Sequence, residues 1–222
     1  MKFLTFDTSL DKTYVTLFDN ENLIETQIIE SHDDKYHSAF LIKNLVLLLK
    51  KHNLSMKDIE AIGVNIGPGS FTGIRACLTI ARVVAQQLEI PLVGVSSMEI
   101  LAQINQKGTQ TAVVMDARKN MCYYALYDKD GKEIQEPQLI NLQDLNFSNL
   151  NLTIISDKVI QDFLANQNIE NICYTDINHD LGKYLGKITY KNLLSSNDYH
   201  WAKVKPLYLQ KPSITLPKKQ LL

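Results

Sequence analysis

The stretch Gly67-Pro68-Gly69-Ser70-Phe71-Thr72-Gly73-Ile74-Arg75 decides the fold of this chain, because it joins a strand pattern to a helix pattern. Before it, the apolar residues 61–66 predict a buried strand, which the glycines and the proline end in a sharp turn. After it, apolar residues recur at helical spacing over 72–89, until Pro91 stops the helix. A strand, a tight turn and a helix in this order are typical of an α/β protein.

Two interpretations of this glycine-rich turn stay open. Backbone N–H groups at the start of a helix can bind a phosphate, helped by the positive end of the helix. A P-loop, however, needs the pattern G-x-x-x-x-G-K-[ST], and no lysine stands at that place. From the residues alone, a tight turn with Ser70 or Thr72 as the helix cap is favoured over phosphate binding.

The same order of elements continues after the first helix. Residues 91–95 predict another buried strand, and Ser96-Ser97-Met98-Glu99 has the S-x-x-E form of a capping box that starts a helix. Farther along, 153–157 predicts a strand and 158–167 a helix, while the Asn-rich stretch 141–151 predicts a loop. The second half of the chain is the less regular one.

Hairpin patterns occur twice in the sequence. The β-branched and aromatic runs 3–6 and 14–18 predict a hairpin with Asp7-Thr8-Ser9 in its turn, and the runs 112–115 and 122–127 repeat it. An offset of 109 residues aligns Asp7 with Asp116, Tyr14 with Tyr123, Leu17 with Leu126, Phe18 with Tyr127 and Asp19 with Asp128. The repeat predicts two related halves, with a chance likeness of two hairpins as the alternative.

A helix predicted over 36–51 is apolar around most of its circumference. A surface helix that serves one core needs an apolar stripe of only about 100°, so a second face of this helix is expected to meet another helix or another chain. The helix 72–89 carries the small residues Ala76, Cys77, Ala81 and Ala85, which let a neighbouring backbone approach closely.

Composition limits the class of protein. The 222 residues suffice for one large or two small domains, and 45% hydrophobic with 21% charged residues are ordinary values for a globular protein. Because 23 basic residues face 24 acidic ones, an independent nucleic-acid-binding module is disfavoured. The basic run 217–219 is interpreted as a solvated tail, and Arg75, Arg82, Arg118 and Lys119 are too few and too dispersed to bind nucleic acid alone.

Cysteine usage and hydropathy predict a cytoplasmic protein. Three cysteines without a C-x-x-C pair build neither a disulfide framework nor a zinc ribbon, which indicates a reducing compartment. The longest apolar run, 45–49, is far too short to span a membrane, and Asp7 interrupts the N-terminus before a signal peptide's apolar region could form. We therefore expect neither export nor membrane anchoring.

The motifs together closely resemble the TsaB family, also called YeaZ. The resemblance rests on the stretch 67–75, on Ile90-Pro91-Leu92-Val93-Gly94-Val95-Ser96-Ser97 and on Asp7-Thr8-Ser9. It extends to His37-Ser38 and Leu41, to Asp116-Ala117-Arg118, and to Pro206-Leu207-Tyr208-Leu209. It is strongest over 1–128. Gln210 stands where an arginine commonly follows the late motif, and 141–200 shows no motif of the family.

This resemblance implies an α/β fold of the actin, sugar-kinase and Hsp70 type, which is a duplicated fold with two related halves. In such folds each half begins with a hairpin whose turn approaches nucleotide phosphate. The halves are expected at 1–104, which pairs with the partner, and at 105–222, which is smaller.

The resemblance also implies a function. TsaB proteins are non-catalytic relatives of TsaD, which binds metal and ATP and transfers threonylcarbamoyl to the adenosine next to the anticodon of tRNA. We therefore expect no catalytic, cofactor or metal site in this chain, TsaD as its partner in a heterodimer, and the ATPase TsaE as a third component. ATP and metal belong to the partner subunits, and tRNA is bound only through the complex, where a tRNA surface shared with TsaD stays open.

The two helices described above resemble the pairing surface for TsaD. When free, the chain is expected to form a homodimer through the same helices. The residues expected at this surface are His37, Phe40, Leu41, Asn44, Leu45, Leu48, Thr72, Arg75, Ala76, Thr79, Ala81 and Val83. For Ala81 the alternative, burial in the core of its own half, stays open.

Two enzymatic alternatives are weighed against the scaffold. A metalloprotease-like site would use H-x-x-x-H, but His32 and His37 lie about 140° apart around a helix, and Asp33 with His37 makes only two ligands. An ATP-dependent phosphotransferase or ATPase could use Asp7 and Asp116, yet no Gly-Gly pair follows Asp116 to build an adenosine pocket. Asp7 is favoured as a turn residue that binds backbone N–H groups.

Overall fold

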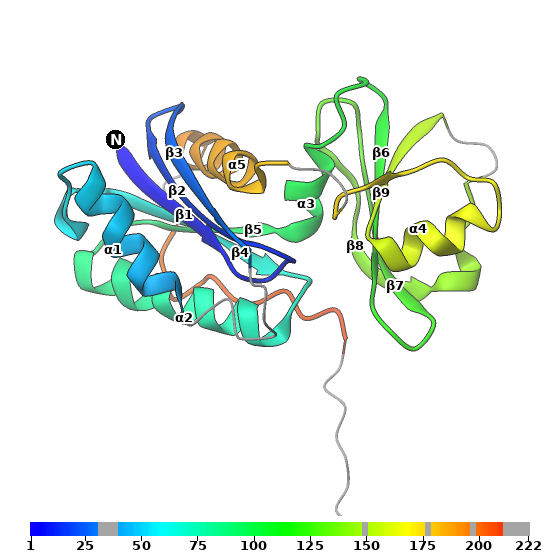
Figure 1. Ribbon diagram of the computed structural model, residues 1–222, viewed down its shortest axis with the longest axis horizontal. Coiled ribbons are helices and arrows are strands. Elements are labelled where there is room, and N and C mark those ends of the chain that lie inside the picture. Colours follow the sequence, from blue (N-terminus) through cyan, green and yellow to red (C-terminus); the bar gives the residue numbers. More distant parts are fainter. Residues whose placement is uncertain (31–39, 148–150, 176–178, 196–198, 211–222) are drawn as a thin grey trace, which may run out of the picture.

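The computed structural model describes residues 1–30, 40–147, 151–175, 179–195 and 199–210. Two five-stranded sheets lie side by side, each with helices packed against it (Figure 1). Buried side chains from both halves, among them Val95, Val113 and Leu185, share one apolar cluster.

The first sheet has the order β3-β2-β1-β4-β5. β1 pairs with β2 in antiparallel and with β4 in parallel orientation, and β4 pairs in parallel with β5. The strands are β1 (Lys2–Asp7), β2 (Thr13–Asp19), β3 (Asn22–Ile29), β4 (Ala61–Gly67) and β5 (Leu92–Ser96). The central strands are buried on both faces, which explains their nearly continuous apolar sequence.

The second sheet repeats this arrangement in the order β10-β9-β6-β7-β8. β6 pairs in antiparallel orientation with β7 and in parallel with β9, as β1 does with β2 and β4. The strands are β6 (Gln110–Asp116), β7 (Met121–Tyr127), β8 (Glu133–Asn141), β9 (Leu152–Ser156) and β10 (Ile172–Cys173). The predicted duplicated α/β fold with two related halves is confirmed.

The residue-by-residue alignment of the two hairpins needs a correction. Asp7 and Asp116 do correspond, because each ends the first strand of its half. In the first hairpin Asp7 lies opposite Tyr14, however, whereas Asp116 lies opposite Cys122. The second turn is therefore one residue shorter, and the offset of the second strand is 108. Since side chains alternate along a strand, the predicted pairs of β2 with β7 residues were wrong by one position.

Helices cover the first sheet on both faces. α1 (Leu41–Lys51) and α2 (Phe71–Leu88) share one apolar cluster with the side chains of Leu4, Val15 and Val64 on one face. The predicted helices 36–51 and 72–89 are thus found, although residues 36–39 lie outside the described residues. The remaining helices are α3 (Ser97–Ala102), α4 (Lys158–Ala165), α5 (Leu181–Ser195) and the 3₁₀ turns η2 (Met56–Asp58) and η3 (Leu142–Asp144).

The opposite face of the first sheet is covered by α5, which comes from the end of the chain (Figure 1). Close packing needs glycine here, because a Cβ at Gly182 would overlap Thr16 and one at Gly186 would overlap the Phe18 ring. After α5, Tyr199 accepts a backbone hydrogen bond from Leu92, and Leu207 donates one to Ile66. Residues 181–195 and 199–210, expected in the C-terminal half, therefore pack largely on the N-terminal sheet.

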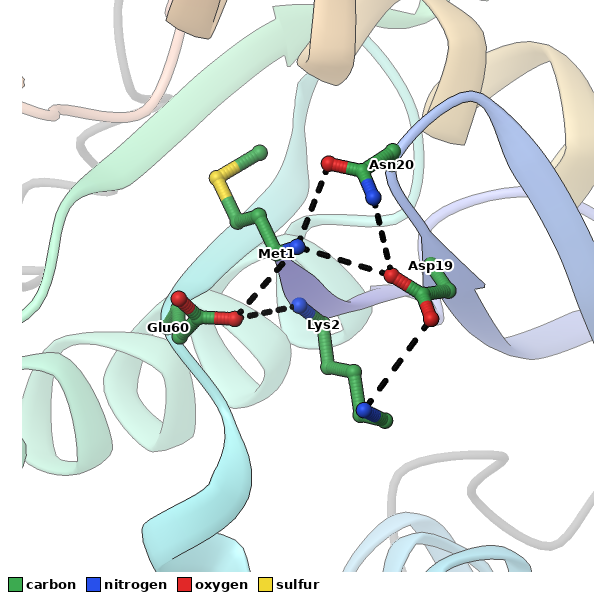
Figure 2. A network of polar contacts seen from close by, with 5 residues as sticks. All are labelled: Met1, Lys2, Asp19, Asn20 and Glu60. Atoms are coloured by element: carbon green, nitrogen blue, oxygen red, sulfur yellow. Dashed lines mark hydrogen bonds and ion pairs between the residues drawn. The ribbon is translucent and has the colours of Figure 1, made fainter.

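A polar network holds the start of β1 (Figure 2). The ammonium group of Met1 lies 3.5 Å from Asp19 and 3.6 Å from Glu60, and it donates a hydrogen bond of 3.1 Å to Asn20. The backbone N–H of Lys2 donates to Glu60 at 2.6 Å. These contacts tie β1 to the end of β2 and to the residue before β4.

The structure also describes the three cysteines and the helices, on which the sequence predicted no disulfide framework and no membrane span. Cys77, Cys122 and Cys173 are all described, and each is a buried free thiol. Burial raises the pKa of Cys77 and of Cys122 to about 12, so both thiols are poor nucleophiles. Among the helices that the structure describes, none combines the length and the apolar character that crossing a bilayer requires.

Candidate functional site

A cleft of about 860 Å³ lies between the two halves. The β1–β2 turn and the start of α2 line it from the first half. The β6–β7 turn and the start of α4 line it from the second half, and the C-terminal segment 207–210 lies along it. Both predicted hairpin turns therefore meet at this cleft, as the duplicated fold requires.

The glycine-rich turn before α2 serves the β1–β2 hairpin. A Cβ at Gly73 would overlap the carbonyl oxygen of Thr8, and one at Gly69 would overlap that of Ser9. Ser70 donates its backbone N–H to Ser9 at 2.8 Å, and the Thr8 hydroxyl donates to the Gly73 carbonyl at 2.7 Å. The glycines thus allow two backbones to touch, which supports the tight-turn interpretation over a phosphate loop.

Hydrogen bonds fully engage the carboxylate of Asp7. It is 2% exposed and accepts from the Ser9 backbone N–H at 2.7 Å and from the Ser9 hydroxyl at 2.5 Å. Its other oxygen accepts from the Asn65 amide at 2.8 Å. Burial raises the pKa of Asp7, and the three hydrogen bonds oppose that rise. Asp7 is thus a structural turn residue, as its sequence position predicted.

The corresponding Asp116 has different contacts. Its carboxylate accepts from the Arg118 backbone N–H at 2.8 Å, while its own N–H donates to Asp157 at 2.5 Å. Asp157 also caps α4 by accepting from Ile160 at 2.9 Å. Burial raises the pKa of Asp157, while the hydrogen bonds from Ile160 and Asp116 oppose that rise. The second hairpin turn is therefore fixed to the start of α4.

The segment 206–210 crosses the cleft from one half to the other, and we call it the strap. The Arg75 guanidinium lies 3.8 Å from the centre of the Phe71 ring and donates to the Tyr208 hydroxyl at 3.0 Å. At the other end, the Gln210 amide donates to the carbonyl of Ala117 in the β6–β7 turn at 2.7 Å. The strap thus joins α2 to the second half.

The outer surface of α1 and α2 carries part of the predicted partner site. Phe40, Thr72, Arg75, Thr79 and Val83 are exposed, whereas Asn44 and Ala76 are half-buried. The α2 members recur every three or four residues, so they form one row on the solvent side of the helix. His37 lies outside the described residues.

Four predicted surface residues are instead buried in the chain's own core, namely Leu41, Leu45, Leu48 and Ala81. They belong to the apolar cluster between α1, α2 and the first sheet. Their assignment to a partner surface is therefore revised. For Ala81, which is 0% exposed, the structure favours the alternative of burial in its own half.

Sequence reasoning missed the apolar side chains that α1 does expose. Ile42, Val46 and Leu47 point away from the core, and Ile42 is 60% exposed. The sequence contained the signal, since α1 is apolar on both faces, but not which face the core would take. Phe71 and Tyr208 were likewise not singled out as a pair, because their contact joins residues far apart in the sequence.

Metal-ligating side chains do not gather in the part of the chain that the structure describes. Within it, no group of three or more His, Cys, Asp or Glu residues has the geometry to hold an ion. His32, Asp33 and His37, which the metalloprotease interpretation concerned, lie outside the described residues.

Comparison with protein families decides the relationship. The model of the family "TsaD: tRNA N6-adenosine threonylcarbamoyltransferase" matches residues 25–180, which is more than half of the chain. The chain belongs to the TsaD family. Within this family it resembles the TsaB proteins, so the resemblance drawn from the motifs is confirmed.

Two curated relatives of this TsaD-family chain bear the name "tRNA threonylcarbamoyladenosine biosynthesis protein TsaB". The protein of Bacillus subtilis (strain 168) is 31% identical over 148 residues, which cover 65% of this chain and 64% of the relative. That of Escherichia coli (strain K12) is 29% identical over 136 residues, covering 59% and 56%. The matched region is thus less than two thirds of these relatives' own length.

A solved structure shares the fold of this TsaD-family chain over nearly its whole length. The structure titled "YeaZ from Pseudomonas aeruginosa" has a TM-score of 0.75 at 20% identity and covers 94% of this chain and 99% of that one. A second structure, described as similar to peptidase YEAZ and from the same organism, gives a TM-score of 0.78 at 19% identity. At 19% and 20% sequence identity, the similarity to these two structures shows that the fold is shared.

Proposed function

We propose that this chain is a non-catalytic subunit that pairs with a TsaD protein for the threonylcarbamoylation of the adenosine next to the anticodon of tRNA. The pathway follows from the family and from the names of the TsaB relatives. In this proposal TsaE is the third component, and ATP and metal are used by the partner subunits. The chain contributes a docking surface.

The outer apolar surface of α1 and α2 carries the pairing part of the proposal. Ile42, Val46 and Leu47 on α1 and Val83 on α2 are all exposed although they are large and apolar. Large apolar side chains that gather on the outer side of neighbouring helices are often covered by a partner in a soluble protein. Arg75 and Thr79 add polar groups to the rim of the same surface.

The non-catalytic part is supported by the first hairpin turn. Asp7 would be the carboxylate of the first half, but it is buried and accepts three hydrogen bonds from Ser9 and Asn65. An ATP-dependent phosphotransferase remains the second candidate, because Asp11, Asp116 and Asp157 line the cleft. Turnover of ATP by the isolated chain distinguishes the two candidates.

Co-purification tests the pairing directly. The chain should be captured by a tagged TsaD from the same organism, and the double variant Ile42→Arg/Val46→Arg should lose this capture. Ile134→Arg, on the exposed side of β8, changes an equally exposed apolar residue and should be captured normally. Equal capture of the double variant and the wild type would refute the docking surface.

The free chain should form a homodimer through the same surface. Light scattering at micromolar concentration should give the mass of two chains for the wild type and of one chain for Ile42→Arg/Val46→Arg. Addition of TsaD should dissolve the homodimer, because both pairings use one surface. A wild-type chain that stays monomeric would count against this part of the proposal.

A further inference from the structure

A row of lysines runs along the solvent side of α5. Lys183, Lys187 and Lys191 follow one another at i, i+4 and i+8, so they lie within about 80° of the helix circumference and about 6 Å apart along its axis. All three are exposed. Between Leu181 and Ser195 there is no aspartate or glutamate, so the helix itself supplies no counter-charge.

Nearby elements do little to neutralise this row. Among the described residues, no ion pair joins these three ammonium groups to a carboxylate within 4.0 Å. Burial, and then Glu133, raise the pKa of Glu99, and Lys191 is near enough to that carboxyl to oppose the rise. Asp180 accepts from the Lys183 backbone N–H at 2.9 Å and so caps the start of α5. The outer row thus keeps its positive charge.

Packing fixes the row in place. Gly182 and Gly186 bring the backbone of α5 against Thr16 and Phe18 of β2, and Tyr190 stacks on Phe3 at 6.2 Å between ring centres. The helix therefore cannot turn its lysines toward the core. Like charges at i, i+4 destabilise a helix slightly, and a bound polyanion would remove this repulsion.

We propose that the outer face of α5, formed by Lys183, Lys187 and Lys191, binds the phosphate backbone of RNA. This proposal revises the expectation that tRNA is bound only through the complex, because it gives this chain a phosphate-binding surface of its own. Evenly spaced flexible ammonium groups on a rigid helix suit a chain of phosphates, to which lysine binds as a point charge. The choice of RNA as the polyanion rests on the proposed function in tRNA modification. This surface was not singled out from the sequence, because its charges become a row only when residues 181–195 form a helix.

Salt dependence of tRNA binding tests the surface. The affinity of the purified chain for an unmodified tRNA transcript is measured between low and moderate salt. In Lys183→Gln/Lys187→Gln/Lys191→Gln, the slope of log K against log salt should fall by about 2 to 3, since each phosphate contact contributes about 0.7–0.9. Glutamine keeps the helix propensity close to that of lysine.

A matched triple variant controls for net charge. Lys107→Gln/Lys129→Gln/Lys132→Gln removes three exposed lysines that lie outside α5, beside strands of the second sheet, and should leave the slope unchanged. An unchanged slope in the α5 variant, an equal fall in both variants, or no tRNA binding by the wild type would each overturn the proposal.

Capture by TsaD is measured on the same proteins. Loss of capture with intact RNA binding would assign α5 to an acidic protein surface instead, whereas failure of the wild type to be captured refutes the proposed pairing alone.

Discussion

At the scale of single residues, Asp7 shows how a carboxylate can be used for structure. Its two oxygens accept from Ser9 and from Asn65, and Asn65 in turn accepts from the Gly67 backbone at 2.8 Å and the Ser97 hydroxyl at 2.9 Å. One buried network thus joins the first hairpin turn to the end of β4 and the start of α3. The sequence could place Asp7 in a turn, but it could not reveal Asn65 as its partner.

Asp7→Asn should destabilise the protein. An amide turns an N–H toward either Ser9 or Asn65, where a donor already points, so one buried donor loses its acceptor at a cost of roughly 1–3 kcal/mol. The free energy of unfolding from urea titrations measures this cost. A variant as stable as the wild type would contradict the network.

The difference between Asp7 and its asparagine variant should also depend on pH. Because burial raises the folded-state pKa of Asp7, its contribution to stability is fully present below the ordinary carboxyl pKa and is lost as the pH rises through the raised value. Asparagine does not titrate. The gap in unfolding free energy between wild type and Asp7→Asn should therefore narrow with rising pH, and a gap that widens would be inconsistent with the raised pKa.

Gly73 provides a second prediction at this scale. In Gly73→Ala the new Cβ overlaps the Thr8 carbonyl, and since backbone cannot move aside as a side chain can, we expect a loss of about 1–3 kcal/mol or more. Gly108→Ala is the control, because a Cβ there meets no atom within 4 Å and adds only the strain of its positive φ. Thermal melts of the two variants should differ clearly, with Gly73→Ala the less stable.

At the scale of elements, the sequence identified where helices and strands lie, but not which of their side chains would face the core. The apolar periodicity of 72–89 predicted α2 to within one residue at each end. Small residues at Ala81 and Ala85 fitted a partner contact as well as a core contact, and only the packing on the sheet shows that both are buried. The sequence likewise could not give the length of the second hairpin turn. Because this turn is shorter by one residue, every predicted correspondence between β2 and β7 was displaced by one position.

Ala81→Arg and Val83→Arg should separate core from surface on α2. Arginine at Ala81 buries an unpaired charge and should cost several kcal/mol, lowering the melting temperature by many degrees. Val83 is 55% exposed, so arginine there should leave the melt unchanged and weaken capture by TsaD. A normal melt for Ala81→Arg would contradict the burial of this residue.

At the scale of the whole molecule, the two halves are related in topology but not independent in packing. α5 comes from the second half of the sequence and covers the first sheet, and the strap crosses the cleft to reach Ala117. The hairpin repeat in the sequence predicted the duplication. It could not predict this exchange, because residues 141–200 contain no recognisable motif and the contacts of α5 with the first sheet are distant in sequence.

The fragment 1–104 should therefore not fold as an independent domain. Without α5, it exposes Phe3 and Phe18, which are fully buried in the intact chain. We expect aggregation, or a circular dichroism melt without a cooperative transition. A cooperative melt near that of the full chain would show that α5 is dispensable for the first half.

Reconstituted tRNA modification tests the central claim, that the chain supports TsaD without an active site of its own. The rate of threonylcarbamoyladenosine formation is measured with TsaD, TsaE, ATP and a threonylcarbamoyl donor, with this chain present or omitted. We predict product only when the chain is present, an unchanged rate with Asp116→Asn, and no ATP turnover by the chain alone. ATP hydrolysis by the isolated chain that disappears in Asp116→Asn would contradict the account.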